Sequence, residues 1–234
     1  MVKIYIPVKD AVDIAEQAIR HLAAWNTPFT VWNDRSTDEN TARLHRLQAE
    51  LGFELIDVAT ITDHPSPNYL MLLKRAQKEA LQTHAHLVIV ESDVLVQPDT
   101  LQQMLKAAET KNCGMVAAIT HDREGNINFP YLYARSYRRD AMHCVSTNKR
   151  LSFCCTLLTN AFLRAFDFEG LNPDKDWFDV TISTESRKHG FDNLLLMDTP
   201  VTHMPHASRP WKQLKYTNPL KYYLLKLFHR RDKI

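Results

Sequence analysis

Short apolar runs alternate with helix-like repeats through the first half of this chain, and this order limits the folds open to it. The predicted strands lie at 3–8, 29–32, 53–57, 87–90 and 114–119. The predicted helices lie at 14–25, 39–51, 69–83 and 98–109. Strands joined through helices form parallel pairs, so the order predicts an α/β fold with a mostly parallel central sheet flanked by helices.

Composition allows one folded domain and excludes several classes of protein. Of the 234 residues, 44% are hydrophobic, which suffices for a core. No run approaches the roughly 20 apolar residues of a membrane span, and the first residues lack the apolar core of a secretory leader. A net charge of +2 does not indicate a nucleic-acid partner. We therefore expect a cytoplasmic protein.

The cysteines indicate the same compartment. The chain has four, without a C-x-x-C pair, which matches neither a disulfide framework nor a zinc site. Two of them, Cys154 and Cys155, are adjacent within the apolar stretch 151–158. We expect both to be core residues.

An acidic tripeptide, Glu91-Ser92-Asp93, closes the predicted strand at 87–90. Carboxylates at the carboxyl edge of a sheet supply hard oxygen ligands for a divalent cation, where a diphosphate can meet it. A strand end that merely turns polar at the solvent is the alternative. With five glycines, the chain has no G-x-G-x-x-G, Walker or G-x-S-x-G sequence, so a metal-bound nucleotide is expected without those loops.

A second polar turn, 33–38, follows the predicted strand at 29–32. An Asp or Ser of this turn is expected to cap the helix that follows. Asp34, at the strand end, can also accept a hydrogen bond from the N–H of a nucleotide base or from a ribose hydroxyl. We expect a nucleotide contact at Asp34.

The order of these motifs resembles the family 2 glycosyltransferases of the GT-A fold. The strand 4–8, the turn 33–38 and the tripeptide 91–93 are similar to the family's first strand, its D-D-G-S-T-D-like turn and its D-x-D motif. Arg35 stands where the family usually has glycine, and Glu91 replaces the first aspartate of D-x-D. The resemblance implies a Rossmann-like GT-A domain that binds a nucleoside diphosphate sugar.

The resemblance also implies domain boundaries. A single catalytic domain at 1–208 would have a nucleotide-binding half over about 1–120 and an acceptor half at 121–208. The tail at 209–234 is rich in basic and aromatic residues. Residues 211–234 are expected to form a helix that either lies on an anionic membrane surface or docks on the domain.

A later block, 179–191, resembles the family's segment that carries the catalytic base. In that register Asp179 falls on the catalytic aspartate, and Asp176 is the alternative. The resemblance implies that this carboxylate deprotonates the acceptor hydroxyl, giving inversion by single displacement. Asp179 is also expected as the N-cap of a helix from Val180 to His189.

The resemblance implies a metal site assembled from separate segments. Asp93 would bind Mn²⁺ or Mg²⁺, and Glu91 would reach the ribose or the water shell of the metal. Val201-Thr202-His203 resembles the late strand whose histidine completes the site, and His206 competes for that role. An imidazole ligand would favour Mn²⁺ over Mg²⁺.

Further contacts are expected with both substrates. The expected donor contacts, for a UDP, GDP or dTDP sugar, are Pro7, Asp34, Lys74, Glu91, Ser92 and Asp93. Lys74 would approach the diphosphate or lie on a solvated helix face. The expected acceptor contacts are Trp177, Asp176 and Tyr131, although aromatic residues also pack in cores.

The expected function is a metal-dependent, inverting transfer of a sugar from a nucleoside diphosphate to a glycan or lipid-linked acceptor. The family suggests bacterial surface polysaccharide or lipopolysaccharide synthesis, in the cytoplasm or at the inner face of the membrane. A sugar-nucleotide nucleotidyltransferase is one alternative, but it usually needs a glycine-rich loop, which 9–13 does not provide. A non-catalytic GT-A-like nucleotide-binding protein is another, because Phe178 and Thr181 replace acidic residues of the family.

Overall fold

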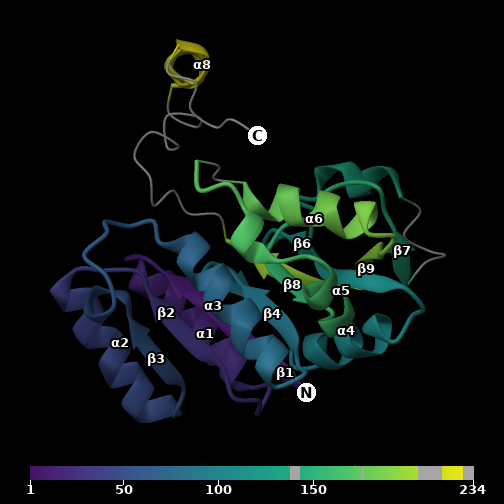
Figure 1. Cartoon of the computed structure of the whole chain (residues 1–234). Helices are drawn as coiled ribbons and strands as arrows, with labels where there is room; N and C mark the ends of the chain where they lie inside the picture. Colours follow the sequence, from purple (N-terminus) through teal and green to yellow (C-terminus); the bar gives the residue numbers. More distant parts are fainter. Residues whose placement is uncertain (138–142, 175–176, 205–217, 229–234) are drawn as a thin grey trace.

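A computed structural model describes residues 1–137, 143–174, 177–204 and 218–228. Within these residues, one mixed sheet has the strand order β3-β2-β1-β4-β8-β6-β9-β5, with β7 paired to β9 (Figure 1). The strands are β1 (Val2–Val8), β2 (Thr30–Asn33), β3 (Glu54–Asp57), β4 (His86–Val90), β5 (Val94–Leu95), β6 (Cys113–His121), β7 (Cys144–Ser146), β8 (Cys155–Leu158) and β9 (Asp192–His203).

Helices connect and cover these strands. The α-helices are α1 (Val12–Ala23), α2 (Asp38–Leu51), α3 (Tyr69–Gln82), α4 (Thr100–Ala108), α5 (Asn160–Ala165), α6 (Phe178–Lys188) and α8 (Pro219–Phe228). Short 3-10 turns are η1 (Val58–Thr60), η2 (Leu132–Ser136) and η4 (Phe168–Gly170). None of the helices described is long and apolar enough to cross a bilayer.

The first half of the sheet is parallel, as the sequence predicts. β1 pairs in parallel with β2 and β4, and β2 pairs in parallel with β3. Successive side chains of a strand point to opposite faces, so Ile4 and Ile6 join a core cluster with α1 and α2, while Tyr5 joins a second cluster with α3. Apolar side chains pack on both faces of the sheet and hold β1, β2 and β4 in place. The edge of the sheet at which these strands end is therefore also held in place.

The second half of the sheet departs from the parallel pattern. β8 lies antiparallel between β4 and β6, and β9 runs parallel to β6 but antiparallel to β5. The sequence indicated only the last residues of β9 and no separate β7. Strands of this half find their partners far along the chain, so local periodicity does not reveal them.

The tail is described in part. α8 forms within the expected helical region, and Leu220, Tyr223 and Leu224 on it are exposed. Figure 1 draws α8 as a separate helix near the C-terminus. The rest of the expected membrane segment lies outside the described residues.

Candidate metal and nucleotide site

The pairing of β4 with β8 places Glu91 next to Cys154. Val90 lies opposite Cys155 in this antiparallel ladder, and the Glu91 N–H continues it by donating to the Cys154 carbonyl at 2.9 Å. The Val94 N–H donates to the Glu91 carbonyl at 3.2 Å, so the chain turns directly after β4. Ser92 lies in this turn, which leads the chain into β5.

The pairing of β5 with β9 brings His203 to Asp93. Val94 lies opposite His203, and the Met204 N–H donates to the Asp93 carbonyl at 2.8 Å. The side chains meet as a consequence, with His203 Nε2 at 3.5 Å from Asp93 Oδ2. Residues 110 positions apart in the chain therefore lie side by side, and their role as metal ligands stays a prediction.

The imidazole of His203 is held in one orientation. Its Nδ1 lies 2.7 Å from the carbonyl oxygen of Phe129, which can only accept, so Nδ1 carries the hydrogen. The Asn128 amide donates to the His203 carbonyl at 2.9 Å. Metal-bound histidines commonly donate their second ring nitrogen to a carbonyl in this way. In the neutral ring, the lone pair of Nε2 faces Asp93 and could act as a ligand.

The end of β4 holds two side chains whose pKa values are shifted from the usual ones, Glu91 and His203. Burial, together with the charge of Asp93, raises the pKa of Glu91 to about 7. Burial opposes ionisation of His203, but the hydrogen bond and charge of Asp93, aided by Glu91, outweigh it and raise the pKa of the ring. The carboxylates of half-buried Glu91 and buried Asp93 repel each other, so a cation between them would stabilise both.

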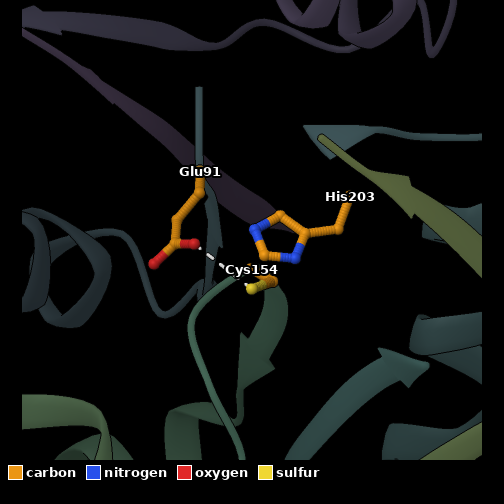
Figure 2. A group of neighbouring side chains, drawn as sticks. All are labelled: Glu91, Cys154 and His203. Carbon is orange, nitrogen blue, oxygen red and sulfur yellow. Dashed lines mark hydrogen bonds between the residues drawn. The ribbon is translucent and has the colours of Figure 1, made fainter. Parts of the chain in front are cut away.

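Figure 2 shows Glu91, Cys154 and His203 converging from three segments. One ligand atom from each lies within 4.8 Å of the others, and the Cys154 thiol donates to Glu91 Oε2 at 3.2 Å. Both cysteines are buried core residues, as the sequence predicts. The sulfur of Cys155 lies 3.8 Å from that of Met104, whereas the Cys154 thiol contacts a carboxylate.

The donor set fits a divalent cation. Glu91 and Asp93 offer carboxylate oxygens, and His203 offers an oriented ring nitrogen. Oxygen ligands suit Mg²⁺ and Mn²⁺, while an imidazole suits the later of these metals. The residues at this strand end therefore fit a divalent cation.

Asp179 lies in the first turn of α6. Trp177, not Asp179, is the N-cap residue, and the Asp179 carboxylate accepts from the Val180 N–H at 2.9 Å. The expectation that Asp179 is the N-cap is thus wrong by two positions. Burial raises the pKa of Asp179 against the opposing effects of the Val180 N–H and Arg150. Its charge in turn contributes to the raised pKa of Glu91, so the two carboxylates lie in one electrostatic environment.

Tyr69, which the sequence analysis missed, lies between these groups. Its ring packs 6.4 Å from the rings of Phe153 and Phe178, centroid to centroid. Its hydroxyl is buried and has no hydrogen-bond partner in the described part of the chain. Burial raises its pKa well above the usual value, helped by the charges of Glu91 and Asp179. An aromatic residue at the start of a predicted helix does not by itself indicate that Tyr69 lies near the site.

Asp34 lies at the end of β2, and its carboxylate already accepts hydrogen bonds from other residues of the protein. Its carboxylate accepts from the Ser66 hydroxyl at 2.7 Å, the Asn68 N–H at 2.8 Å and the Asn68 amide at 2.7 Å. The predicted nucleotide contact therefore stays a prediction. The cap of α2 is Thr37, whose hydroxyl accepts from Asn40, and not an Asp or Ser as expected.

Arg35 adopts the conformation that the family's glycine would take. Its φ is 57°, in the left-handed region that glycine enters without cost. The Arg35 guanidinium donates to the Thr62 carbonyl, and the Lys9 ammonium donates to the Arg35 carbonyl. These contacts hold the turn in place despite the side chain.

The remaining predicted contacts are dispersed. Pro7 lies within β1, opposite Trp32, and Lys74 forms an ion pair with Glu169 at 2.7 Å. Lys74 thus has an acidic partner outside the Glu91 cluster.

The acceptor residues divide into three cases. Tyr131 is fully buried and its hydroxyl donates to the Ser152 carbonyl at 3.1 Å, so it is a core residue and not a sugar platform. Trp177 is partly exposed, with the Arg150 guanidinium 5.9 Å from its ring centroid. Asp176 and His206 lie outside the described residues.

Solved structures share this fold. The mannosyltransferase PcManGT from Pyrobaculum calidifontis, solved with GDP-Man and Mn²⁺, has a TM-score of 0.65 at 15% identity, covering 97% of this chain and 64% of that protein. TarS 1–349 from S. aureus, in complex with UDP-GlcNAc, has a TM-score of 0.64 at 14% identity, covering 88% of this chain and 59% of that one. This chain thus spans about three fifths of each, and the likeness establishes a GT-A type fold.

The sequence comparison is more specific. No curated protein sequence matches the chain. The profile described as glycosyltransferase-like family 2 matches residues 23–218, which include Glu91, Asp93, Asp179 and His203. The chain belongs to glycosyltransferase-like family 2.

Proposed function

We propose that this protein is a metal-dependent, inverting glycosyltransferase that takes its sugar from a nucleoside diphosphate. The observation that carries the proposal is the meeting of Glu91, Asp93 and His203 at the end of β4, with the Asp179 carboxylate in the same electrostatic environment. Similar folds solved with GDP-Man and with UDP-GlcNAc support a nucleotide-sugar donor.

Asp93 and His203 would hold the cation, with Glu91 beside them. When bound, a divalent ion supplies a Lewis acid that neutralises charge on the departing diphosphate. The protein prepares this role by orienting the His203 ring through the Phe129 carbonyl and by keeping Glu91 and Asp93 buried together. Either Mn²⁺ or Mg²⁺ satisfies the donor set, and the imidazole favours Mn²⁺.

Asp179 would act as the general base. Its buried carboxylate has a raised pKa, which brings it closer to that of an effective base near neutral pH. A base that takes the proton of the acceptor hydroxyl allows a single displacement at the anomeric carbon, with inversion. Replacing Asp179 by Asn should preserve nucleotide affinity and lower kcat by about 10²–10⁴-fold.

The acceptor we propose is a glycan or a lipid-linked glycan of a bacterial surface polysaccharide. Exposed Leu220, Tyr223 and Leu224 on α8, next to Lys221, support contact with an anionic membrane surface. Deleting residues 211–234 should then release the protein from anionic vesicles and leave activity on a soluble acceptor. Unchanged vesicle binding by the truncated protein would argue for docking of the tail on the domain.

Calorimetric binding of UDP, GDP, dTDP and CDP, each with Mn²⁺ and with chelator, tests the proposal. Metal-dependent binding of one nucleotide, followed by release of that nucleoside diphosphate and an inverted product, is the expected result. Binding without turnover on any acceptor would instead indicate a non-catalytic nucleotide-binding protein. Release of pyrophosphate would indicate a nucleotidyltransferase.

A further inference from the structure

We propose that Cys154 is a metal ligand, and that it gives this site a higher affinity for Zn²⁺ than for Mn²⁺ or Mg²⁺. The inference rests on the proposed function only in placing the ion at Glu91, Asp93 and His203. The D-x-D-like tripeptide and the late histidine do not include a thiol, so Cys154 adds a sulfur donor to the oxygen and nitrogen donors of the site.

The position of the thiol is set by the backbone. The Cys154 carbonyl accepts from the Glu91 N–H at 2.9 Å, which continues the β4–β8 ladder to the two residues. The sulfur lies 3.2 Å from Glu91 Oε2 and 3.5 Å from the Ser152 hydroxyl oxygen. Cys154 is 1% exposed, so this sulfur has no freedom to swing into solvent. Figure 2 shows it facing the same space as Glu91 and His203.

The chemistry of the donors favours zinc. Zn²⁺ binds thiolate, imidazole and carboxylate ligands, and its closed sites have four protein donors. Glu91, Cys154 and His203 offer three donors within 4.8 Å of one another, and Asp93, whose Oδ2 lies 3.5 Å from His203 Nε2, would supply the fourth. Mn²⁺ lies below Zn²⁺ in the order of affinities for a given site, and Mg²⁺ prefers oxygen donors. A site that encloses Zn²⁺ with four protein donors leaves no open position for a diphosphate.

Binding therefore changes the Cys154 thiol. The S–H bond, which points to Glu91 in the ion-free protein, breaks heterolytically. The sulfur keeps the electron pair and donates it to the metal, and the proton leaves to the solvent. Zinc would then occupy the site without supporting nucleotide binding, which makes it an inhibitor that competes with Mn²⁺.

Titration of the metal-free, full-length protein with Cd²⁺ tests the inference, because a cadmium–thiolate bond has its own ultraviolet charge-transfer band. The wild type and a Cys144→Ser control should show the band, and Cys154→Ser should lose it. In calorimetry, Zn²⁺ should bind the wild type at least about 10-fold more tightly than Mn²⁺, and Cys154→Ser should lose about 10–100-fold in Zn²⁺ affinity. Circular dichroism would verify folding, and Cys154→Ala gives a second variant.

The outcomes separate this inference from the proposed function. Mn²⁺-dependent nucleotide binding by the wild type without a cadmium–thiolate band would overturn the role of Cys154 alone. A band that persists in folded Cys154→Ser and Cys154→Ala would do the same. A wild type that binds neither Mn²⁺ nor Zn²⁺ would overturn both proposals. Excess Zn²⁺ that leaves Mn²⁺-dependent nucleotide binding unchanged would refute the competition.

Discussion

Strands β2 and β4 end in carboxylates at the same edge of the sheet, but the two strand ends differ in how those carboxylates are satisfied. Asp34 accepts three hydrogen bonds from Ser66 and Asn68, so protein donors already surround it. Glu91 lies near Asp93, and burial of its carboxyl group, followed by repulsion from Asp93, raises its pKa to about 7. The difference indicates that an acidic strand end is a candidate cation site where two carboxylates repel each other, and a structural joint where backbone and side-chain donors surround one carboxylate.

The largest expected effect comes from removing a carboxylate at the end of β4, where Glu91 and Asp93 repel each other. Asp93→Asn should weaken Mn²⁺-dependent nucleotide binding by about 100-fold or more, because it removes a ligand and the charge that attracts the cation. Calorimetry with and without Mn²⁺ measures the loss. Glu109→Gln, an exposed change at the end of α4, is the matched control and should bind normally. Normal binding by Asp93→Asn would remove it from the site.

Removing the carboxylate at the end of β2, that of Asp34, should lower the stability of the fold. Asp34→Ala leaves the Asn68 N–H and amide without their acceptor at a position where both residues are buried. The free energy of unfolding should fall by about 2–3 kcal/mol, since hydrogen bonds to a charged group are involved. Urea denaturation measures this, with Asp38→Asn, exposed in the first turn of α2, as control. An unchanged midpoint would show that the two strand ends do not differ as described.

A pH series sharpens the contrast at Glu91. Its pKa in the folded, ion-free protein is raised to about 7, above the roughly 4.3 of an unfolded glutamate. Ionisation therefore costs stability in the folded state, and the wild type should lose stability relative to Glu91→Gln as pH rises from about 4.3 through about 7. Denaturation at several pH values in chelator tests the sign. A difference that grows in the opposite direction would mean that Glu91 is stabilised as an anion.

The smallest effect is expected at Tyr69, which packs between the residues preceding Cys154 and Asp179. Its buried hydroxyl has no hydrogen-bond partner in the described part of the chain, so Tyr69→Phe should leave the melting temperature unchanged or raise it slightly. Differential scanning calorimetry measures this. Tyr131→Phe, which removes a hydroxyl that donates to Ser152 and accepts from its N–H, should lower it instead. A clear loss of stability in Tyr69→Phe would reveal a partner for this hydroxyl.

The parallel half of the fold could be predicted because its signals are local. Helix faces such as Ile19 and Leu22 repeat within one segment, and each β-α-β unit pairs strands that are near in sequence. β8 and β9 carry no such signal. Their partners β4 and β5 lie about 68 and 108 residues away, and the pairing depends on which edge the first strands leave open.

The candidate site likewise contains residues that motifs in the sequence predict and residues that they do not. The residue types that hold the charges, Glu91, Asp93 and His203, could be named from motifs, and so could Asp179. Cys154 could not, because an apolar stretch does not say which of two adjacent cysteines faces the acidic turn. Tyr131 shows the converse error, since an aromatic residue in a loop-like segment proved to be fully buried.

The amino-acid sequence by itself determined the α/β class, the order of the motifs and the family, because these depend on local periodicity and on residue types at chain positions. Tertiary structure alone decided that β8 brings a thiol to Glu91, that β9 brings an imidazole to Asp93, and that Asp34 is satisfied by Asn68. The physical reason is that electrostatic environment is a property of distance in space. Strand pairing sets that distance between segments that the chain keeps far apart.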